Sequence, residues 1–241
     1  MRAETRHQLK EDRFSKATLQ AAEKTVHWTQ EHQGKLIAAA VAAIVIAAIA
    51  LGGWYYVNSQ DEKASHDFAA AVRTFDTPVR PAGVPEQPGF SSFESSQARA
   101  TAARKQFQAI ADNYPSTHTG KMARYFVGLT AAQLGDNSAA EHNLQDAAGS
   151  SDAELASLGK FALASVYDAE KKDAQAVDLY RQLIDKPTMS VSKLTAQFEL
   201  ASFYEAHQKP DEAKKVYEQI EKENPASEAA SMAQRRSSEL K

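Results

Sequence analysis

Residues 200–225, LASFYEAHQKPDEAKKVYEQIEKENP, contain two short patterns on either side of a turn. The first pattern, L-A-x-x-Y, begins at Leu200, and the second, A-x-x-x-Y-x-x-I-x-x-x-x-P, begins at Ala213. Large residues spaced three and four positions apart are typical of one face of an α-helix. The intervening QKPD, residues 208–211, has the chemistry of a turn. The stretch therefore predicts two α-helices joined as a hairpin.

The second pattern recurs along the chain at a nearly constant spacing. Its leading alanines are Ala103, Ala140, Ala176 and Ala213, which lie 37, 36 and 37 residues apart. The first pattern has relatives upstream, V-G-x-x-A from residue 127 and L-A-x-x-Y from residue 163. A fixed period of this length predicts a stack of repeated units.

Small residues mark the points where the paired helices should touch. We expect Gly128, Ala164 and Ala201 on first helices to face Ala140, Ala176 and Ala213 on second helices, because small side chains let two backbones approach closely. The pattern resembles the tetratricopeptide repeat, a helical hairpin of about 34 residues. The alternative is an unrelated helical bundle. Such a bundle would not need the same spacing to recur in both patterns, as it does here.

The predicted fold is all-α, with one N-terminal transmembrane helix followed by an α-solenoid of tetratricopeptide-like hairpins. The first repeat lacks a partner helix directly upstream, because Pro85, Pro88 and Gly89 exclude one there. We expect residues 58–75 to supply that helix and residues 76–93 to form a Pro-rich loop. The repeats should occupy residues 94–225, and a capping helix, residues 226–241, should cover the last hairpin.

An uncharged run precedes the repeats. Residues 36–57, LIAAAVAAIVIAAIALGGWYYV, measure about 33 Å as a helix, against a hydrocarbon layer of about 30 Å. Trp54, Tyr55 and Tyr56 lie at its end, where amphipathic rings favour the headgroup region. We therefore predict a transmembrane helix over residues 35–57. The alternative is a cleaved signal peptide. A signal peptide, however, has a shorter segment before its apolar region, and that region is only about 7–15 residues long.

The residues before the span form a polar tail, residues 1–34. Residues 1–35 hold seven Lys and Arg residues, and the 20 residues after Val57 hold two, so the positive-inside rule favours a cytoplasmic N-terminus. Leu9, Phe14 and Leu19 approximate one apolar helical stripe. The tail is therefore either an amphipathic helix on the membrane surface or a polar segment without such contact.

The sequence offers little to catalysis. It has no cysteine, and none of its seven histidines forms an i, i+4 pair for a metal. S-x-x-K occurs at Ser157 and Ser190 without companion motifs, so we interpret both as solvated helix surface. Residues 36–241 carry a net charge of −5, which disfavours nucleic acid. We predict no enzyme, no cofactor, no metal and no small-molecule substrate.

The first helices provide a candidate peptide-binding groove. In the repeat family, positions 2, 5, 9 and 12 of each first helix line the inner surface, and position 5 here is aromatic in three successive repeats. Such a stripe suits an apolar peptide, although the rings could instead pack as core. No Lys or Arg occupies position 5, which disfavours recognition of a free chain terminus there. The candidate residues are Met122, Tyr125, Leu129, Leu158, Phe161, Ser165, Asp168, Phe198, Ser202 and Glu205.

Three segments around the span carry a closer resemblance. They are W-x-x-E-x-x-G-K at residues 28–35, GWYYVNSQ at residues 53–60 and KASHDFAAAV at residues 63–72. With the repeats that follow, they resemble the ancillary SecYEG translocon subunit family, the YfgM-like proteins. The resemblance implies a single-pass protein of the bacterial inner membrane with its repeat domain in the periplasm. It also implies two protein partners, the translocon and a membrane-anchored periplasmic chaperone and prolyl isomerase.

A second resemblance supports an alternative function. Q-x5-Y-P-S from Gln108 and R-Y-x-x-G-L from Arg124 are similar to segments of periplasmic repeat proteins that coordinate envelope constriction and outer-membrane assembly. Those proteins are cleaved soluble proteins or lipoproteins, whereas this chain has an uncharged span and no cysteine for a lipid. A scaffold for envelope biogenesis or cell division therefore stays the alternative to a component of protein export.

Overall fold

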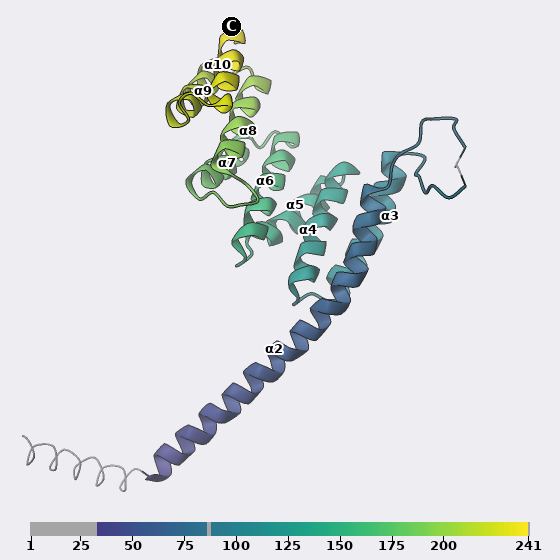
Figure 1. Cartoon of the computed structure of the whole chain (residues 1–241), viewed down its shortest axis with the longest axis vertical. Helices are drawn as coiled ribbons and strands as arrows, with labels where there is room; N and C mark the ends of the chain where they lie inside the picture. Colours follow the sequence, from purple (N-terminus) through teal and green to yellow (C-terminus); the bar gives the residue numbers. More distant parts are fainter. Residues whose placement is uncertain (1–32, 86–87, 241) are drawn as a thin grey trace, which may run out of the picture. The chain divides into compact units, whose positions relative to one another are not determined.

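The computed structural model describes residues 33–85 and 88–240 (Figure 1). Residues 1–32, which hold almost all of the predicted tail, lie outside this range. Within the described residues the chain is helical, and its only β feature is an isolated bridge between Val79 and Phe93. The expected all-α class is confirmed. The helices are α2 (Gln33–Asp76), α3 (Ser96–Asn113), α4 (His118–Gln133), α5 (Asn137–Ala148), α6 (Ala153–Ala169), α7 (Asp173–Asp185), α8 (Lys193–Ala206), α9 (Pro210–Glu223) and α10 (Glu228–Glu239).

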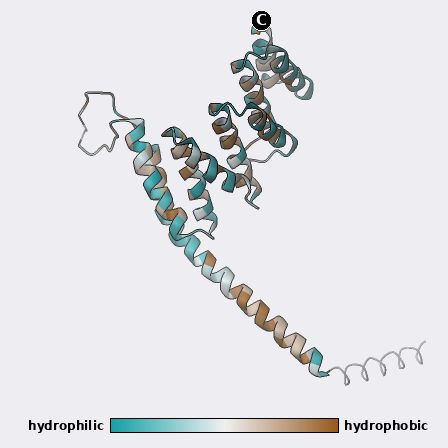
Figure 2. Cartoon of the chain, turned by 180° about the vertical axis from the view of Figure 1, so that it is seen from behind, coloured by the Kyte–Doolittle hydropathy of each residue, from teal (hydrophilic) through white to brown (hydrophobic). Residues whose placement is uncertain are grey.

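The chain divides into two units, Met1–Tyr56 and Val57–Lys241. The described part of the first unit is the apolar N-terminal portion of α2, which Figure 2 shows as a run of hydrophobic residues. Its large side chains are exposed, among them Ile44 at 68% and Ile49 at 70%. By length and composition, α2 is the one helix in the described residues that could cross a membrane.

The second unit is a stack of helical hairpins. Each helix from α3 to α10 packs against the next one along the chain (Figure 1). The six small residues expected at the helix contacts are all buried, and Ala140, Ala176 and Ala213 are fully so. A Cβ at Gly128 would lie 2.7 Å from Leu144 Cγ, inside normal contact distance. The predicted close approach is confirmed for α4 and α5, where Gly128 meets Leu144.

A second close approach joins one hairpin to the next. A Cβ on Gly159 of α6 would overlap the backbone nitrogen of Ala148 and lie 2.7 Å from the carbonyl carbon of Ala147, both in α5. Because backbone atoms cannot move aside as a flexible side chain does, α5 and α6 can pack this closely only with glycine at the contact. The repeat pattern alone did not identify this residue.

Residues 57–76 of α2 belong to the second unit and cover the start of the stack. Ala64 and Ala71 are fully buried there, and Phe68 lies 5.5 Å from the ring of Phe107 on α3. A polar contact supports the apolar one, because the backbone N–H of Thr119 at the start of α4 donates a hydrogen bond of 2.8 Å to Asp61 Oδ1. The first hairpin therefore receives its partner helix from across a long loop.

The helix ends follow local sequence chemistry. Side-chain oxygens of Ser95, Thr117, Asp136, Asp152, Ser192 and Ser227 accept backbone N–H groups at six helix N-termini. The turns inside the three hairpins need a left-handed residue, and they place Gly135, Lys171 and Gln208 at φ values of 78°, 60° and 56°. Only the first of these turns has glycine, which adopts the left-handed conformation without strain, at this position.

A polar network closes the far end of the stack. Gln197 of α8 is 1% exposed, and its Nε2 donates a hydrogen bond of 3.0 Å to Glu223 Oε2 at the end of α9. The other carboxylate oxygen accepts from Lys193 Nζ at 2.7 Å and from Gln219 Nε2 at 3.1 Å. These donors, Lys193 first, lower the pKa of Glu223 to about 2. The network ties the C-terminal end of α9 to α8.

Replacing Gly159 with alanine tests the contact between hairpins. Alanine favours a helix over glycine by about 1 kcal/mol, but here its methyl group would force α5 and α6 apart. We expect a net loss of about 1–3 kcal/mol of unfolding free energy, and a fall of the melting temperature by about 2–4 °C for each kcal/mol. The measurement is a thermal melt by circular dichroism. Gly149→Ala is the control, because its Cβ would meet only ordinary contacts; an equal melting temperature for both variants would contradict the interpretation.

Glu223→Gln tests the polar network through its pH dependence. The carboxyl has a lower pKa in the folded chain than in the unfolded one, so its stabilising effect is complete above about pH 4.5 and disappears as the pH falls to about 2. We expect the variant to melt below the wild type at pH 7, and the gap to close between pH 4.5 and 2. The exposed Glu218 of the same helix provides the control variant Glu218→Gln. A gap that stays constant with pH would exclude the carboxylate as its source.

Candidate functional site

The ten predicted groove residues lie on three first helices, α4, α6 and α8. Spacings of three, four and seven residues put the members of each helix on one face. None of the ten is fully buried. Ser165 and Ser202 are exposed, and the other eight are half-buried. The structure therefore brings them together in sets of three or four on each helix, at positions that solvent reaches.

The three aromatic rings of this face are held from one side. Phe161 lies 6.3 Å from the ring of Tyr180 on α7, and Phe198 lies 6.1 Å from the ring of Tyr217 on α9. Tyr125 has its nearest ring contact with Phe126 of its own helix, at 5.4 Å. All three pack against the core while remaining partly exposed. Each ring therefore contacts the core on one side and solvent on the other.

Second-helix tyrosines contact two of these rings, Phe161 and Phe198, and the sequence analysis did not include these tyrosines in the site. Tyr217 is fully buried and its hydroxyl donates a hydrogen bond of 2.7 Å to Glu205 Oε1. Burial and this carboxylate raise the pKa of Tyr217 above its usual range. Burial likewise raises the pKa of Tyr180. Their position as the Y of A-x-x-x-Y was the signal that could have identified them.

The acidic side chains at the distal end of the face already have partners. Asp168 Oδ1 lies 3.2 Å from His207 Nε2, which also lies 3.5 Å from Asp173 Oδ1. Glu205 binds Tyr217 and lies 3.5 Å from Arg236 of α10. Arg236 offsets part of the charge of Glu205, and the other contacts occupy carboxylate oxygens of Asp168 and Glu205. The two carboxylates are therefore less available to a basic ligand than their sequence positions suggest.

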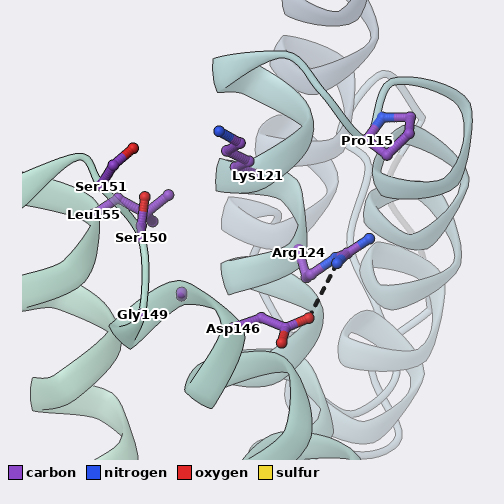
Figure 3. Close-up of a pocket in the computed structure, with 9 residues that line it drawn as sticks. Pro115, Lys121, Arg124, Asp146, Gly149, Ser150, Ser151 and Leu155 are labelled. Atoms are coloured by element: carbon purple, nitrogen blue, oxygen red, sulfur yellow. Dashed lines mark hydrogen bonds and ion pairs between the residues drawn. The ribbon is translucent and has the colours of Figure 1, made fainter.

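Cavities lie mainly elsewhere. One of about 480 Å³ lies between α4 and the turn from α5 to α6 (Figure 3). Another, of about 430 Å³, lies between α7 and α9, and one of about 250 Å³ lies between α2 and α3. A fourth, of about 470 Å³, includes Glu205, the only predicted groove residue that lines any of these four cavities. These four cavities therefore do not form a small-molecule pocket on the aromatic face.

One prediction about the S-x-x-K sequences is wrong. Ser157, expected on solvated surface, is 4% exposed. Its hydroxyl donates to the carbonyl of Glu154 at 2.8 Å and bonds with Thr188 Oγ1 at 2.7 Å. The residue joins α6 to the loop after α7, a contact between segments distant in sequence. In residues 33–85 and 88–240 no group of three His, Cys, Asp or Glu side chains could hold a metal ion.

The comparisons with known proteins support the repeat architecture. A family model described as a tetratricopeptide repeat-like domain matches residues 24–240, nearly the whole chain. No curated protein and no solved structure matches this chain. Domains of this kind are typically scaffolds for protein–protein interaction, not enzymes, because stacked hairpins provide extended binding surfaces. On the match and the stacked hairpins together, the chain belongs to the tetratricopeptide repeat-like domain family.

Proposed function

We propose that the protein is a membrane-anchored scaffold that binds other polypeptides along the face formed by α4, α6 and α8. The observation that carries the proposal is the half-buried aromatic residue at the same position of three successive first helices, Tyr125, Phe161 and Phe198. Aromatic rings offer a large contact area and lose little conformational entropy on binding. Rings that are already held by the core have still less entropy to lose.

The face favours an apolar ligand that binds in one orientation along the stack. Its α4 end is apolar, with Met122, Tyr125 and Leu129, whereas its α8 end combines Phe198 with the exposed Ser202 and the paired Glu205. An amphipathic helix or an extended apolar segment would match this change in polarity. Such segments are exposed in polypeptides that have not yet folded, which makes an unfolded chain a suitable ligand.

We propose that the apolar N-terminal segment anchors the repeats to a membrane. The apolar portion of α2 is exposed and long enough to span, and it is preceded by a basic tail. We propose a single pass through the bacterial inner membrane, with the N-terminus cytoplasmic and residues 58–241 in the periplasm. The support comes from the charge difference across the span and from the resemblance of residues 28–72 to YfgM-like proteins.

That resemblance also supports a specific role. We propose that the protein is an ancillary component of the translocon and chaperone network in protein export, with the SecYEG translocon and a membrane-anchored periplasmic prolyl isomerase as partners. The alternative is a periplasmic scaffold for envelope biogenesis or cell division, which the segments at Gln108 and Arg124 support. Both roles use the same protein-binding surface, so identification of the partner separates them.

Arginine substitutions on the exposed serines test the binding face. Ser165→Arg or Ser202→Arg would place a long charged side chain over the aromatic residues without altering the core. We expect the affinity for a polypeptide ligand to fall about tenfold or more, and the melting temperature to change little. A photocrosslinker at Thr195, exposed on α8, would report binding in intact membranes, with mass spectrometry of the products.

The control is Ser138→Arg, an exposed serine on the second helix α5. Crosslinks to translocon or chaperone subunits that Ser165→Arg removes, and Ser138→Arg retains, would support the export role. Crosslinks to proteins of division or outer-membrane assembly would favour the alternative. If Ser165→Arg and Ser202→Arg both gave the same crosslinked products as the wild type, binding at this face would be excluded.

Fusions to alkaline phosphatase, which is active only in the periplasm, test the orientation. We expect an active enzyme when it follows Lys241 and an inactive one when it precedes Met1, because the basic tail should stay in the cytoplasm. A β-galactosidase fusion, active only in the cytoplasm, should give the opposite pair of results. The reverse pattern from the two reporters would place the repeats in the cytoplasm.

A further inference from the structure

The cavity of about 480 Å³ lies outside the aromatic face. Lys121 and Arg124 of α4 form one wall, and Gly149 and Ser150 of the turn between α5 and α6 form the other (Figure 3). Successive helical residues are rotated by about 100°, so Arg124 leaves α4 in a different direction from Met122 and Tyr125, whereas Lys121, four residues before Tyr125, borders the aromatic face. The two surfaces adjoin on α4, but none of the ten groove residues lines this cavity.

The basic side chains of this cavity have unused hydrogen-bonding capacity. Lys121 is exposed and forms no ion pair within residues 33–85 and 88–240. Arg124 donates through Nη1 to Asp146 Oδ2 at 3.0 Å, which engages only one of the five N–H groups of a guanidinium. Asp146 is therefore the carboxylate that offsets one of the two positive charges, and a net positive charge remains.

The other carboxylate beside the cavity is engaged within the protein. Asp152 follows the lining residue Ser151, and its Oδ1 accepts the backbone N–H groups of Glu154 and Leu155 at 2.9 and 3.2 Å. Its Oδ2 lies 3.2 Å from His118 Nδ1. Asp152 is thus committed to the N-terminus of α6, and it does not pair with Lys121. The cavity is a local basic site in a domain whose net charge is negative.

We propose that this cavity binds a carboxylate of a protein partner, supplied by an acidic side chain or by a chain terminus. The ammonium of Lys121 and the free donors of Arg124 would bind the carboxylate oxygens, and the hydroxyl of Ser150 stands on the facing wall. Pro115, exposed at the edge, offers apolar contact to a neighbouring residue of the ligand. A volume of about 480 Å³ accommodates one or two residues. This site does not depend on the proposed function of the aromatic face.

Three short peptides test the proposal on the full chain in detergent micelles. Acetylated and amidated LDEL carries carboxylates only on side chains, acetylated LNQL with a free C-terminus carries only a terminal one, and acetylated, amidated LNQL carries none. We expect the first or second peptide to shift the backbone amide signals of Gly149, Ser150 and Ser151 in nitrogen-15 spectra, and the third to leave them unchanged. The peptide that binds identifies the source of the carboxylate, and added salt should weaken its binding.

Variants of Lys121 separate a specific site from general charge. Lys121→Gln should weaken binding about five- to tenfold, Lys121→Arg should retain most of it, and Lys222→Gln, an exposed lysine on α9, should have no effect. Ser165→Arg, on the aromatic face, should also leave binding of these peptides unchanged. A failure of the cavity proposal can therefore be distinguished from a failure of the proposed function of the aromatic face. Equal binding of all three peptides, no binding by any, or an unchanged affinity in Lys121→Gln would overturn the proposal.

Discussion

The close approach of helices at glycine and alanine is the contact on which the rest of the structure depends. Ala140, Ala176 and Ala213 are fully buried at equivalent points of three hairpins. Gly128 meets Leu144 so closely that a Cβ there would lie 2.7 Å from Leu144 Cγ, so the first of these hairpins has no room for a larger side chain at that contact. Gly159 extends the principle to the contact between hairpins, where a Cβ would overlap the backbone of Ala148. A repeated contact of small residues produces a stack whose first helices carry equivalent residues to equivalent positions.

A stack of this kind has two ends, and each needs a cover for its apolar face. At the start, residues 57–76 of α2 place Ala64, Ala71 and Phe68 against α3 and α4, and Asp61 binds the N-terminus of α4. At the other end, α10 buries only Ala233 completely, packs Ala229 against the core and leaves a mostly polar remainder, with Met232 41% exposed. The same helix that contains the candidate membrane span therefore completes the apolar core of the first hairpin.

The repeat also explains why the chain offers two different surfaces. Tyr125, Phe161 and Phe198 occupy equivalent positions of three first helices, so the binding face that we propose is repetitive and would suit a long ligand. The cavity beside Lys121 and Gly149 depends on one particular turn, so it occurs once among the four cavities described and suits a single residue. A scaffold with both could hold an apolar segment of one protein while contacting an acidic residue of the same or another protein.

The sequence by itself determined the period, the hairpins, the small residues at their contacts and the candidate span. These features follow from local rules, because helical spacing, turn chemistry and the length of an apolar run are properties of neighbouring residues. Only the tertiary structure decided how the half-buried rings meet the second-helix tyrosines and how Asp168 and Glu205 contact His207 and Arg236. It also decided that Ser157 is buried against Thr188, 31 residues away. Contacts of this kind join side chains from different helices or from a helix and a loop, and no periodicity within one helix specifies which of them will meet.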